Sequence, residues 1–308
     1  MIYAHLELYL RRHLKSASGA YNYMRDIENF IAVNPGYQMY GYVEVSKYFA
    51  WLNDRYRRED GRATGSVSRI FAAVKLLYSF LVHSGLRDTH PFPLSYRIKG
   101  MRKKGLDEGK VLTPSELNHL LILFRNAENR LTALPARNLA AVSLLVHQAP
   151  TSAEIFALKV SDIDLDQGTI KIPATVSTDA RVLPLHPSQF MVLHSYLTGA
   201  RRRLLGDYSA TETVSKRFLL GLGGTGQSRQ LFAPIFKPYK LLFGNKPVTA
   251  ENIRMSVIYN RLNVDKLPLE TVQAFAGHKW PSSTEKYVSR IDVEDRDFIN
   301  GIHPMELL

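Results

Sequence analysis

The chain has 308 residues, no cysteine, 45% hydrophobic residues, and 40 Lys and Arg against 28 Asp and Glu, for a formal net charge of +12 at pH 7. This length provides for about two domains, and the apolar fraction excludes general disorder. The lack of cysteine excludes disulfides, thiolate metal sites and a cysteine nucleophile. The first residues place their basic pair after the apolar stretch, unlike a secretory signal. No apolar run reaches the roughly 18 residues that span a bilayer, so we expect a cytoplasmic protein with no membrane contact.

The surplus of positive charge favours a nucleic-acid partner. Lys and Arg side chains that neutralise phosphates release condensed counterions, and this release drives binding. A membrane surface, an acidic protein or a need for solubility alone would also explain a charge of this size. The composition therefore favours a nucleic-acid partner, and it does not indicate a reaction.

Residues 1–89 predict a helical domain. Apolar residues recur at spacings of three and four, which is typical of helices with one buried face. Gly19, Pro35 with Gly36, and Gly61 are predicted breaks between the helices. Four helices follow from the apolar groups Leu6, Leu8, Tyr9 and Leu10; Tyr21, Met24, Ile27, Phe30 and Ile31; Val45, Phe49, Trp51 and Leu52; and Ile70, Phe71, Val74, Leu77, Tyr78 and Leu81.

Residues 90–112 are predicted to form a basic linker. Two prolines and mutually repelling cations favour an extended chain. The linker is either a solvated tether or a strap across a phosphate backbone, and we predict that its cations bind DNA. These cations are Arg97, Lys99, Arg102, Lys103 and Lys104.

A second domain is predicted over residues 113–290. Thr113, Pro114 and Glu116 form a capping-box pattern that begins its first helix. Alternating residues in 169–172 and 181–185 predict a β-hairpin. Further helices are predicted over 137–147 and 187–205, after Thr249, from Pro268, and around Tyr287. The predicted fold class is mainly α with a small β-hairpin or sheet. The histidines lack metal-ligand spacing, so we expect no metal site.

Three segments carry the functional motifs. Gly277 and His278 are followed by Tyr287 nine residues after the histidine, residues 249–256 precede them, and residues 151–158 precede the hairpin. In order and spacing these segments resemble the tyrosine recombinases, or phage integrase family, over most of 113–290. The resemblance implies a SAM-like core-binding domain in residues 1–89 and a catalytic domain in 113–290, which close around double-stranded DNA.

The resemblance also implies a reaction. A tyrosine hydroxyl attacks a backbone phosphate, forms a 3′-phosphotyrosyl link and releases a 5′-hydroxyl, so that no cofactor is needed. Cationic side chains stabilise the charge on the equatorial oxygens. The family uses two arginines, a lysine on the hairpin turn as general acid, and two histidines.

Three catalytic positions of the family are kept. Tyr287 stands at the nucleophile, His278 at the second histidine, and Arg254 at the arginine of a His-x-x-Arg motif. Each also has an ordinary structural interpretation: Tyr287 as a packing residue, Arg254 in a local ion pair, and His278 at the end of a helix. Their joint order and spacing favour the catalytic interpretation.

Three further positions depart from the family. Thr151 stands where the first arginine belongs, and Glu251 where the first histidine belongs. Val176 lies in the turn 174–180, which contains no lysine. An ionised carboxylate at residue 251 would repel a phosphate. Nearby cations that could compensate are Arg181, also predicted as a DNA-binding residue, together with Lys171 and Lys159.

Two functions follow, and we favour the first. The chain is either a site-specific recombinase that cuts and rejoins DNA through Tyr287, or a catalytically impaired relative that acts as a DNA-binding accessory or regulatory protein. A basic helical protein unrelated to DNA is the remaining alternative. The tail 291–308 is predicted either to dock on a neighbouring protomer or to pack on its own domain. Its apolar residues are Phe298, Ile299, Ile302, Met305, Leu307 and Leu308.

Overall fold

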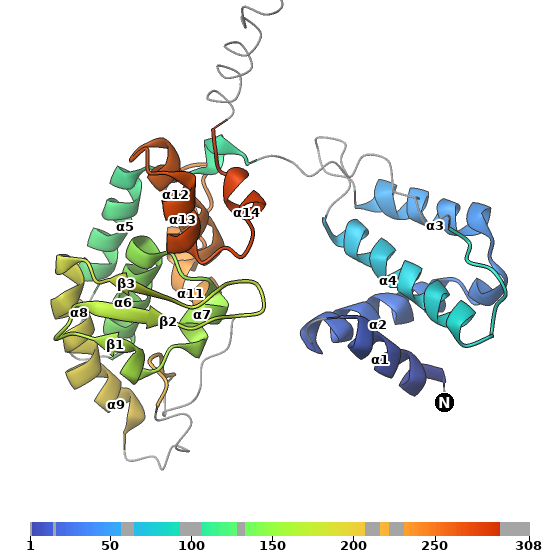
Figure 1. The fold of residues 1–308 in the computed structure, drawn as a ribbon, viewed down its shortest axis with the longest axis horizontal. Coiled ribbons are helices and arrows are strands. Elements are labelled where there is room, and N and C mark those ends of the chain that lie inside the picture. Colours follow the sequence, from blue (N-terminus) through green and yellow to red (C-terminus); the bar gives the residue numbers. More distant parts are fainter. Residues whose placement is uncertain are drawn as a thin grey trace, which may run out of the picture. The chain divides into compact units, whose positions relative to one another are not determined.

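The computed structural model of the chain divides into two compact units, Met1–Lys104 and Gly105–Leu308. Residues 2–14, 17–56, 65–92, 106–127, 133–206, 216–221 and 231–289 are described. The fold class predicted from the sequence is confirmed, since the chain is mainly helical with one small sheet (Figure 1). The predicted DNA-binding residues of the linker, Arg97, Lys99, Arg102, Lys103 and Lys104, and the tail from residue 290 lie outside the described residues.

Unit 1 is a helical unit built around aromatic side chains. Phe30, Phe49, Phe71, Tyr78 and Phe92 are buried in one apolar cluster. Its helices are α1 (Ile2–His13), α2 (Ala17–Val33), α3 (Tyr42–Arg55) and α4 (Gly65–His83), with a 3₁₀ turn at Tyr37–Met39 (Figure 1).

Unit 1 differs from the sequence prediction at Gly19 and on three helix faces, where Tyr21, Leu8 and Trp51 are exposed and not buried. Gly19 lies inside α2 rather than between helices. Tyr21 is 70% exposed, because the buried face of α2 runs through Ala20, Ile27 and Phe30 instead. A period of 3.6 residues places Tyr21 about 100° around the helix from Ala20, away from the core.

Unit 2 is arranged around α6 (Ala133–Gln148), which is buried on nearly all sides and packs against five neighbouring helical segments. A helix that is apolar all round belongs at the centre of a unit of this size. The other elements are α5 (Pro114–Asn126), α7 (Ser152–Ala157), β1 (Ile163–Asp164), β2 (Thr169–Ile172), β3 (Arg181–Pro184), α8 (Phe190–Ser195), α9 (Arg201–Leu205), α11 (Phe232–Phe236), α12 (Ala250–Asn263), α13 (Leu269–Ala276) and α14 (Ser282–Glu285).

The predicted helix over 187–205 is a composite. A 3₁₀ turn at Pro187–Gln189 precedes α8, and a π-helical segment, Tyr196–Ala200, joins α8 to α9. Further 3₁₀ turns lie at Glu108–Lys110, Val160–Asp162 and Lys237–Tyr239.

The sheet is antiparallel, in the order β1-β2-β3. In the hairpin, Ile172 pairs with Arg181 and Ile170 with Leu183. The turn between β2 and β3 extends beside α13 and α14 (Figure 1), where Thr178 forms an isolated antiparallel bridge with His278. The hairpin therefore brings its turn to the segment that holds the Gly-His motif.

The last helices position the motif residues. The hydroxyl of Thr249 accepts from the Asn252 N–H and begins α12, as predicted. Gly277 ends α13 with a φ of +66°. The predicted helix around Tyr287 is shorter than expected, since α14 ends at Glu285. Tyr287 follows in a turn, and its N–H donates to the Thr284 carbonyl. None of the helices in the described ranges has the length and apolar character that a bilayer crossing requires.

Candidate active site

Glu154 is the centre of the candidate site. Its side chain is fully buried, and it lies in the first turn of α7. Its carboxylate accepts from the Thr151 N–H at 2.6 Å, and the Thr151 hydroxyl accepts from the Glu154 N–H at 3.2 Å. This capping box satisfies two N–H groups that helix geometry leaves free. The side chain at position 151, where the resemblance expects a cation, is therefore the cap of a helix.

Arg181 forms an ion pair with Glu154. Its two terminal nitrogens donate to the two carboxylate oxygens at 2.6 and 3.2 Å, and the Thr178 hydroxyl donates to the same carboxylate at 2.6 Å. Burial acts to raise the pKa of Glu154, but Arg181 and Thr178 together hold that pKa below its ordinary value. The sequence predicts Arg181 as a DNA-binding residue, and in the structure its guanidinium is bound to Glu154 and its side chain is 6% exposed.

Arg254 joins the site from α12. Its guanidinium donates to the Ala276 carbonyl at 2.8 Å and to the Ala149 carbonyl, and a terminal nitrogen lies 3.9 Å from a Glu154 oxygen. Burial lowers the pKa of Arg254 to about 10, although the charge of Glu154 opposes the shift. The group therefore keeps its positive charge at neutral pH. Arg254 connects the ends of α6 and α13 to α7.

His278 and Tyr287 lie next to these cations. Their rings are parallel within 6°, with centroids 6.1 Å apart. The His278 Nδ1 hydrogen-bonds the Thr284 hydroxyl at 2.8 Å. Burial and then the charge of Arg254 lower the pKa of His278 to about 4, so its ring is neutral at pH 7. Tyr287 is 8% exposed, and the Lys286 ammonium lies 4.8 Å from the centroid of its ring.

The close approach of the hairpin to the end of α13 requires glycine at position 277. A Cβ there would lie 2.5 Å from an Arg181 nitrogen and 2.9 Å from the Asp179 carbonyl oxygen. The Gly277 carbonyl also accepts from the Asp179 N–H at 2.9 Å. The positive φ is a second reason, since side-chain-bearing residues avoid it. The Gly-His motif is therefore needed to bring the hairpin and α13 together.

The structure thus brings Tyr287, His278, Arg254 and Arg181 together, and it places the three altered positions around them. Glu251 is exposed in the first turn of α12, one turn before Arg254. Val176 is 68% exposed in the hairpin turn. Lys171 on β2 and Lys159 after α7 are both exposed.

Two cations at the site were not predicted from the sequence. Lys279 donates to the Val176 carbonyl at 3.2 Å, and Lys286 lies over the Tyr287 ring. Both flank motif residues directly, at one residue after His278 and one before Tyr287. This adjacency was the signal available in the sequence. It could not tell in which direction either side chain extends.

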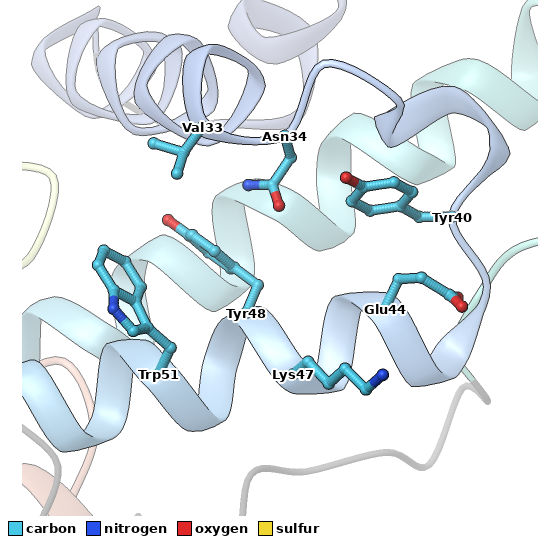
Figure 2. Close-up of a pocket in the computed structure, with 7 residues that line it drawn as sticks. All are labelled: Val33, Asn34, Tyr40, Glu44, Lys47, Tyr48 and Trp51. Atoms are coloured by element: carbon cyan, nitrogen blue, oxygen red, sulfur yellow. The ribbon is translucent and has the colours of Figure 1, made fainter.

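The described ranges contain no group of three or more His, Asp or Glu side chains that could hold a metal ion. A cavity of about 430 Å³ lies in unit 1, at the end of α2 and along α3 (Figure 2). Tyr40, Tyr48 and Trp51 give it an aromatic wall. None of the motif residues lines it, so we assign it no part in the chemistry.

Two relatives that are similar in sequence are both tyrosine recombinases. Tyrosine recombinase XerC of Roseiflexus castenholzii is 30% identical over 275 residues, which cover 88% of this chain and 83% of the relative. Tyrosine recombinase XerD of Listeria monocytogenes serotype 4b is 26% identical over 293 residues, which cover 94% of this chain and 93% of the relative.

Solved structures share the fold. The XerH site-specific recombinase bound to palindromic difH substrate, in a post-cleavage complex, has a TM-score of 0.66 at 16% identity, covering 92% of this chain and 79% of that one. The Tn1549 transposon integrase in complex with a circular intermediate DNA has a TM-score of 0.65 at 13% identity, covering 95% of this chain and 99% of that one.

Residues 110–292 match the model of the phage integrase family. This chain belongs to the phage integrase family of tyrosine recombinases.

Proposed function

We propose that this chain is a site-specific recombinase that cuts and rejoins double-stranded DNA through Tyr287. The observation that carries the proposal is the placement of Tyr287 beside a neutral His278 and the buried cations Arg254 and Arg181. Relatives named as tyrosine recombinases, and neighbours of the same fold bound to DNA, support DNA as the substrate. We expect the protein to act on DNA in the cytoplasm.

The reaction follows from the chemistry of the group at position 287. The Tyr287 hydroxyl oxygen attacks a backbone phosphorus, the bond to the 5′-oxygen breaks, and a 3′-phosphotyrosyl bond forms. The phosphodiester energy is kept in that bond, so a 5′-hydroxyl can reverse the step and join a new strand. Arg254 supplies a fixed positive charge toward which a phosphate is attracted. A neutral His278 can donate a hydrogen bond to a phosphate oxygen without holding a full charge.

The second candidate function is that of an impaired relative, which binds DNA as an accessory or regulatory protein. Three observations favour it. Thr151 is the cap of α7, the Arg254 guanidinium already donates to two backbone carbonyls, and Glu251 adds an exposed carboxylate one turn away. Loss of an arginine that clamps a transferring phosphoryl group costs about 10³–10⁵ in rate.

A covalent adduct distinguishes the two candidates. A preferred duplex is first selected from fragmented DNA by its binding to the full chain. Copies of it carrying single nicks at successive positions then trap the cleaved state, because the short released strand diffuses away. The recombinase gives a denaturation-resistant protein–DNA adduct that Tyr287→Phe lacks, while both proteins bind the duplex equally. Binding without an adduct at any nick position would establish the impaired relative.

Two parts of the proposal concern residues outside the described ranges. We propose that the linker cations Arg97, Lys99, Arg102, Lys103 and Lys104 contact phosphates, in which case their joint replacement by Gln lowers the salt dependence of DNA binding. We also propose that the tail after Asp297 docks on a neighbouring protomer. Its deletion should then weaken assembly of several protomers on DNA more than binding of one. Unchanged assembly in a mobility-shift titration would refute the tail proposal.

A further inference from the structure

Lys279 lies where two segments of the site meet. The Thr178–His278 bridge and the hydrogen bond from the Asp179 N–H to the Gly277 carbonyl align residues 277–279 with the hairpin turn. From this position the Lys279 ammonium reaches the turn and donates to the Val176 carbonyl at 3.2 Å. The turn 174–180 has no lysine of its own, so Lys279 brings an ammonium group to it from a different segment.

Cleavage requires a proton at the side of phosphorus opposite the nucleophile. The attacking and leaving oxygens lie roughly in line, and a 5′-alkoxide is a poor leaving group unless a proton reaches it as the bond breaks. The acid must therefore lie near Tyr287 without lying against its ring.

The cations of the site differ in how they meet this requirement. The Lys286 ammonium lies over the Tyr287 ring, on the side of the nucleophile. The guanidinium groups of Arg181 and Arg254 are buried and already donate to Glu154 and to the Ala149 and Ala276 carbonyls, so we take them as fixed charges and not as acids. His278 is neutral at pH 7 because of its lowered pKa. Lys279 is exposed and its ammonium reaches the hairpin turn, where it donates to the Val176 carbonyl and has further N–H groups to offer.

We propose that Lys279 is the general acid of DNA cleavage, a role that rests on the function proposed above. As the Tyr287 oxygen bonds to phosphorus and the bond to the 5′-oxygen breaks, the Lys279 ammonium gives a proton to that oxygen, which leaves as a 5′-hydroxyl. The phenolic proton of Tyr287 passes to water, and water later restores the proton of Lys279. Protons and charge balance over the cycle without another reactant.

The test replaces the scissile 5′-oxygen by sulfur. A thiolate is a much better leaving group than an alkoxide and departs without a proton, so a 5′-thio substrate removes the need for a general acid. Lys279→Ala should slow cleavage of the ordinary nicked duplex by about 10²–10⁴ and cleave the 5′-thio duplex within a few-fold of the wild-type rate. Lys240→Ala, which removes an exposed lysine after α11, should match the wild type on both substrates. Tyr287→Phe should cleave neither.

Each other outcome has a distinct meaning. If Lys279→Ala is equally slow on both substrates, the residue only positions the site, and the proposal is overturned. Normal cleavage of the ordinary duplex by Lys279→Ala also overturns it. If the wild-type chain cleaves only the 5′-thio duplex, the site has a nucleophile and no general acid, so Tyr287 keeps its role and Lys279 loses the role assigned here. If the wild type cleaves neither, the recombinase function itself fails.

Discussion

Arg181 and Glu154 form a buried ion pair that joins β3 to α7, with two hydrogen bonds of 2.6 and 3.2 Å between guanidinium and carboxylate. Their side chains are 6% and 0% exposed. Replacing both members of such a pair by apolar groups changes the stability of a protein little. Removing one member lowers the stability strongly, because the other charge is left buried without its partner. Since Thr178 and Arg254 also reach Glu154, the pair supports the whole site.

A double-mutant cycle tests this pair. Arg181→Met should lower the free energy of unfolding by about 3–5 kcal/mol, because it removes the cation that donates to both oxygens of a buried carboxylate. Glu154→Gln removes that charge and keeps an oxygen for the Thr151 N–H. The double variant should therefore be more stable than the sum of the two single losses implies. Urea denaturation gives the free energy of unfolding of the wild type, the two single variants and the double variant. Additive losses would show that the two residues act independently.

Gly277→Ala should destabilise the chain for two separable reasons. The positive φ costs a side-chain-bearing residue about 1–2 kcal/mol, and the contacts at 2.5 and 2.9 Å add overpacking of about 1–3 kcal/mol. Gly244 has a φ of +62°, and no atom lies within 4 Å of the position that a Cβ would take there. Gly244→Ala should therefore show the conformational cost alone. Equal losses in thermal unfolding of the two variants would contradict the close approach of Arg181.

The pH dependence of stability should report on His278. Its pKa is about 4 in the folded chain and 6.5 as the reference value, so the unfolded chain binds more protons between these limits. The stability contributed by the neutral ring is complete above pH 6.5 and is lost as the pH falls toward 4. The groups whose charges act on the ring are Arg254, Lys286, Arg181 and Glu154. His147, with a pKa lowered to about 4 by burial and by His186, adds to the same slope.

Urea denaturation at about pH 4.5, 5.5 and 7.5 measures this slope. His278→Gln should flatten the pH profile, and His194→Gln, which replaces an exposed histidine on α8, serves as the control. A profile unchanged by His278→Gln would mean that His278 does not lose its proton on folding. NMR titration of the ring protons, assigned with the two variants, gives the His278 pKa directly.

Local patterns predicted local structure well. The capping box of Thr113 and Glu116 and the cap formed by Thr249 are present, since each involves a side chain and an N–H three residues apart. Gly277 ends α13 because it adopts the left-handed backbone conformation, which is also a property of the single residue. The strand β1 has only two residues and carries no alternation, so nothing in the sequence distinguished it from a loop.

The site could be predicted in part only. Spacing located the motif residues Tyr287, His278 and Arg254, which the structure brings together. It could not show that Arg181 pairs with Glu154, 27 residues away, or that Lys279 reaches Val176 across 103 residues. Such contacts depend on the path of the chain between the two residues. An arginine bound to a buried carboxylate and one that faces solvent look alike in the sequence.

Glu251→Gln should strengthen DNA binding and speed cleavage. Glu251 is exposed one turn before Arg254, so its carboxylate repels a phosphate drawn to the site. A like charge at short range in water is worth about 1 kcal/mol, or roughly a fivefold change in binding or rate. A glutamate in the first turn of a helix also interacts favourably with the positive end of the helix dipole, by about 0.3–1 kcal/mol, so the substitution lowers stability slightly.

Glu270→Gln is the matched control for this prediction. Glu270 is likewise exposed at the second position of a helix, α13, and its loss removes the same charge and the same dipole interaction. We expect a similar small fall in thermal stability for both variants and the gain in affinity and cleavage only for Glu251→Gln. Mobility-shift titrations measure the affinity and nicked-duplex assays measure the cleavage rate, each at low and at high salt. The gain should shrink at high salt, because salt screens the exposed charge. An equal gain from Glu270→Gln would show that net charge, and not the place of Glu251 beside Arg254, governs the effect.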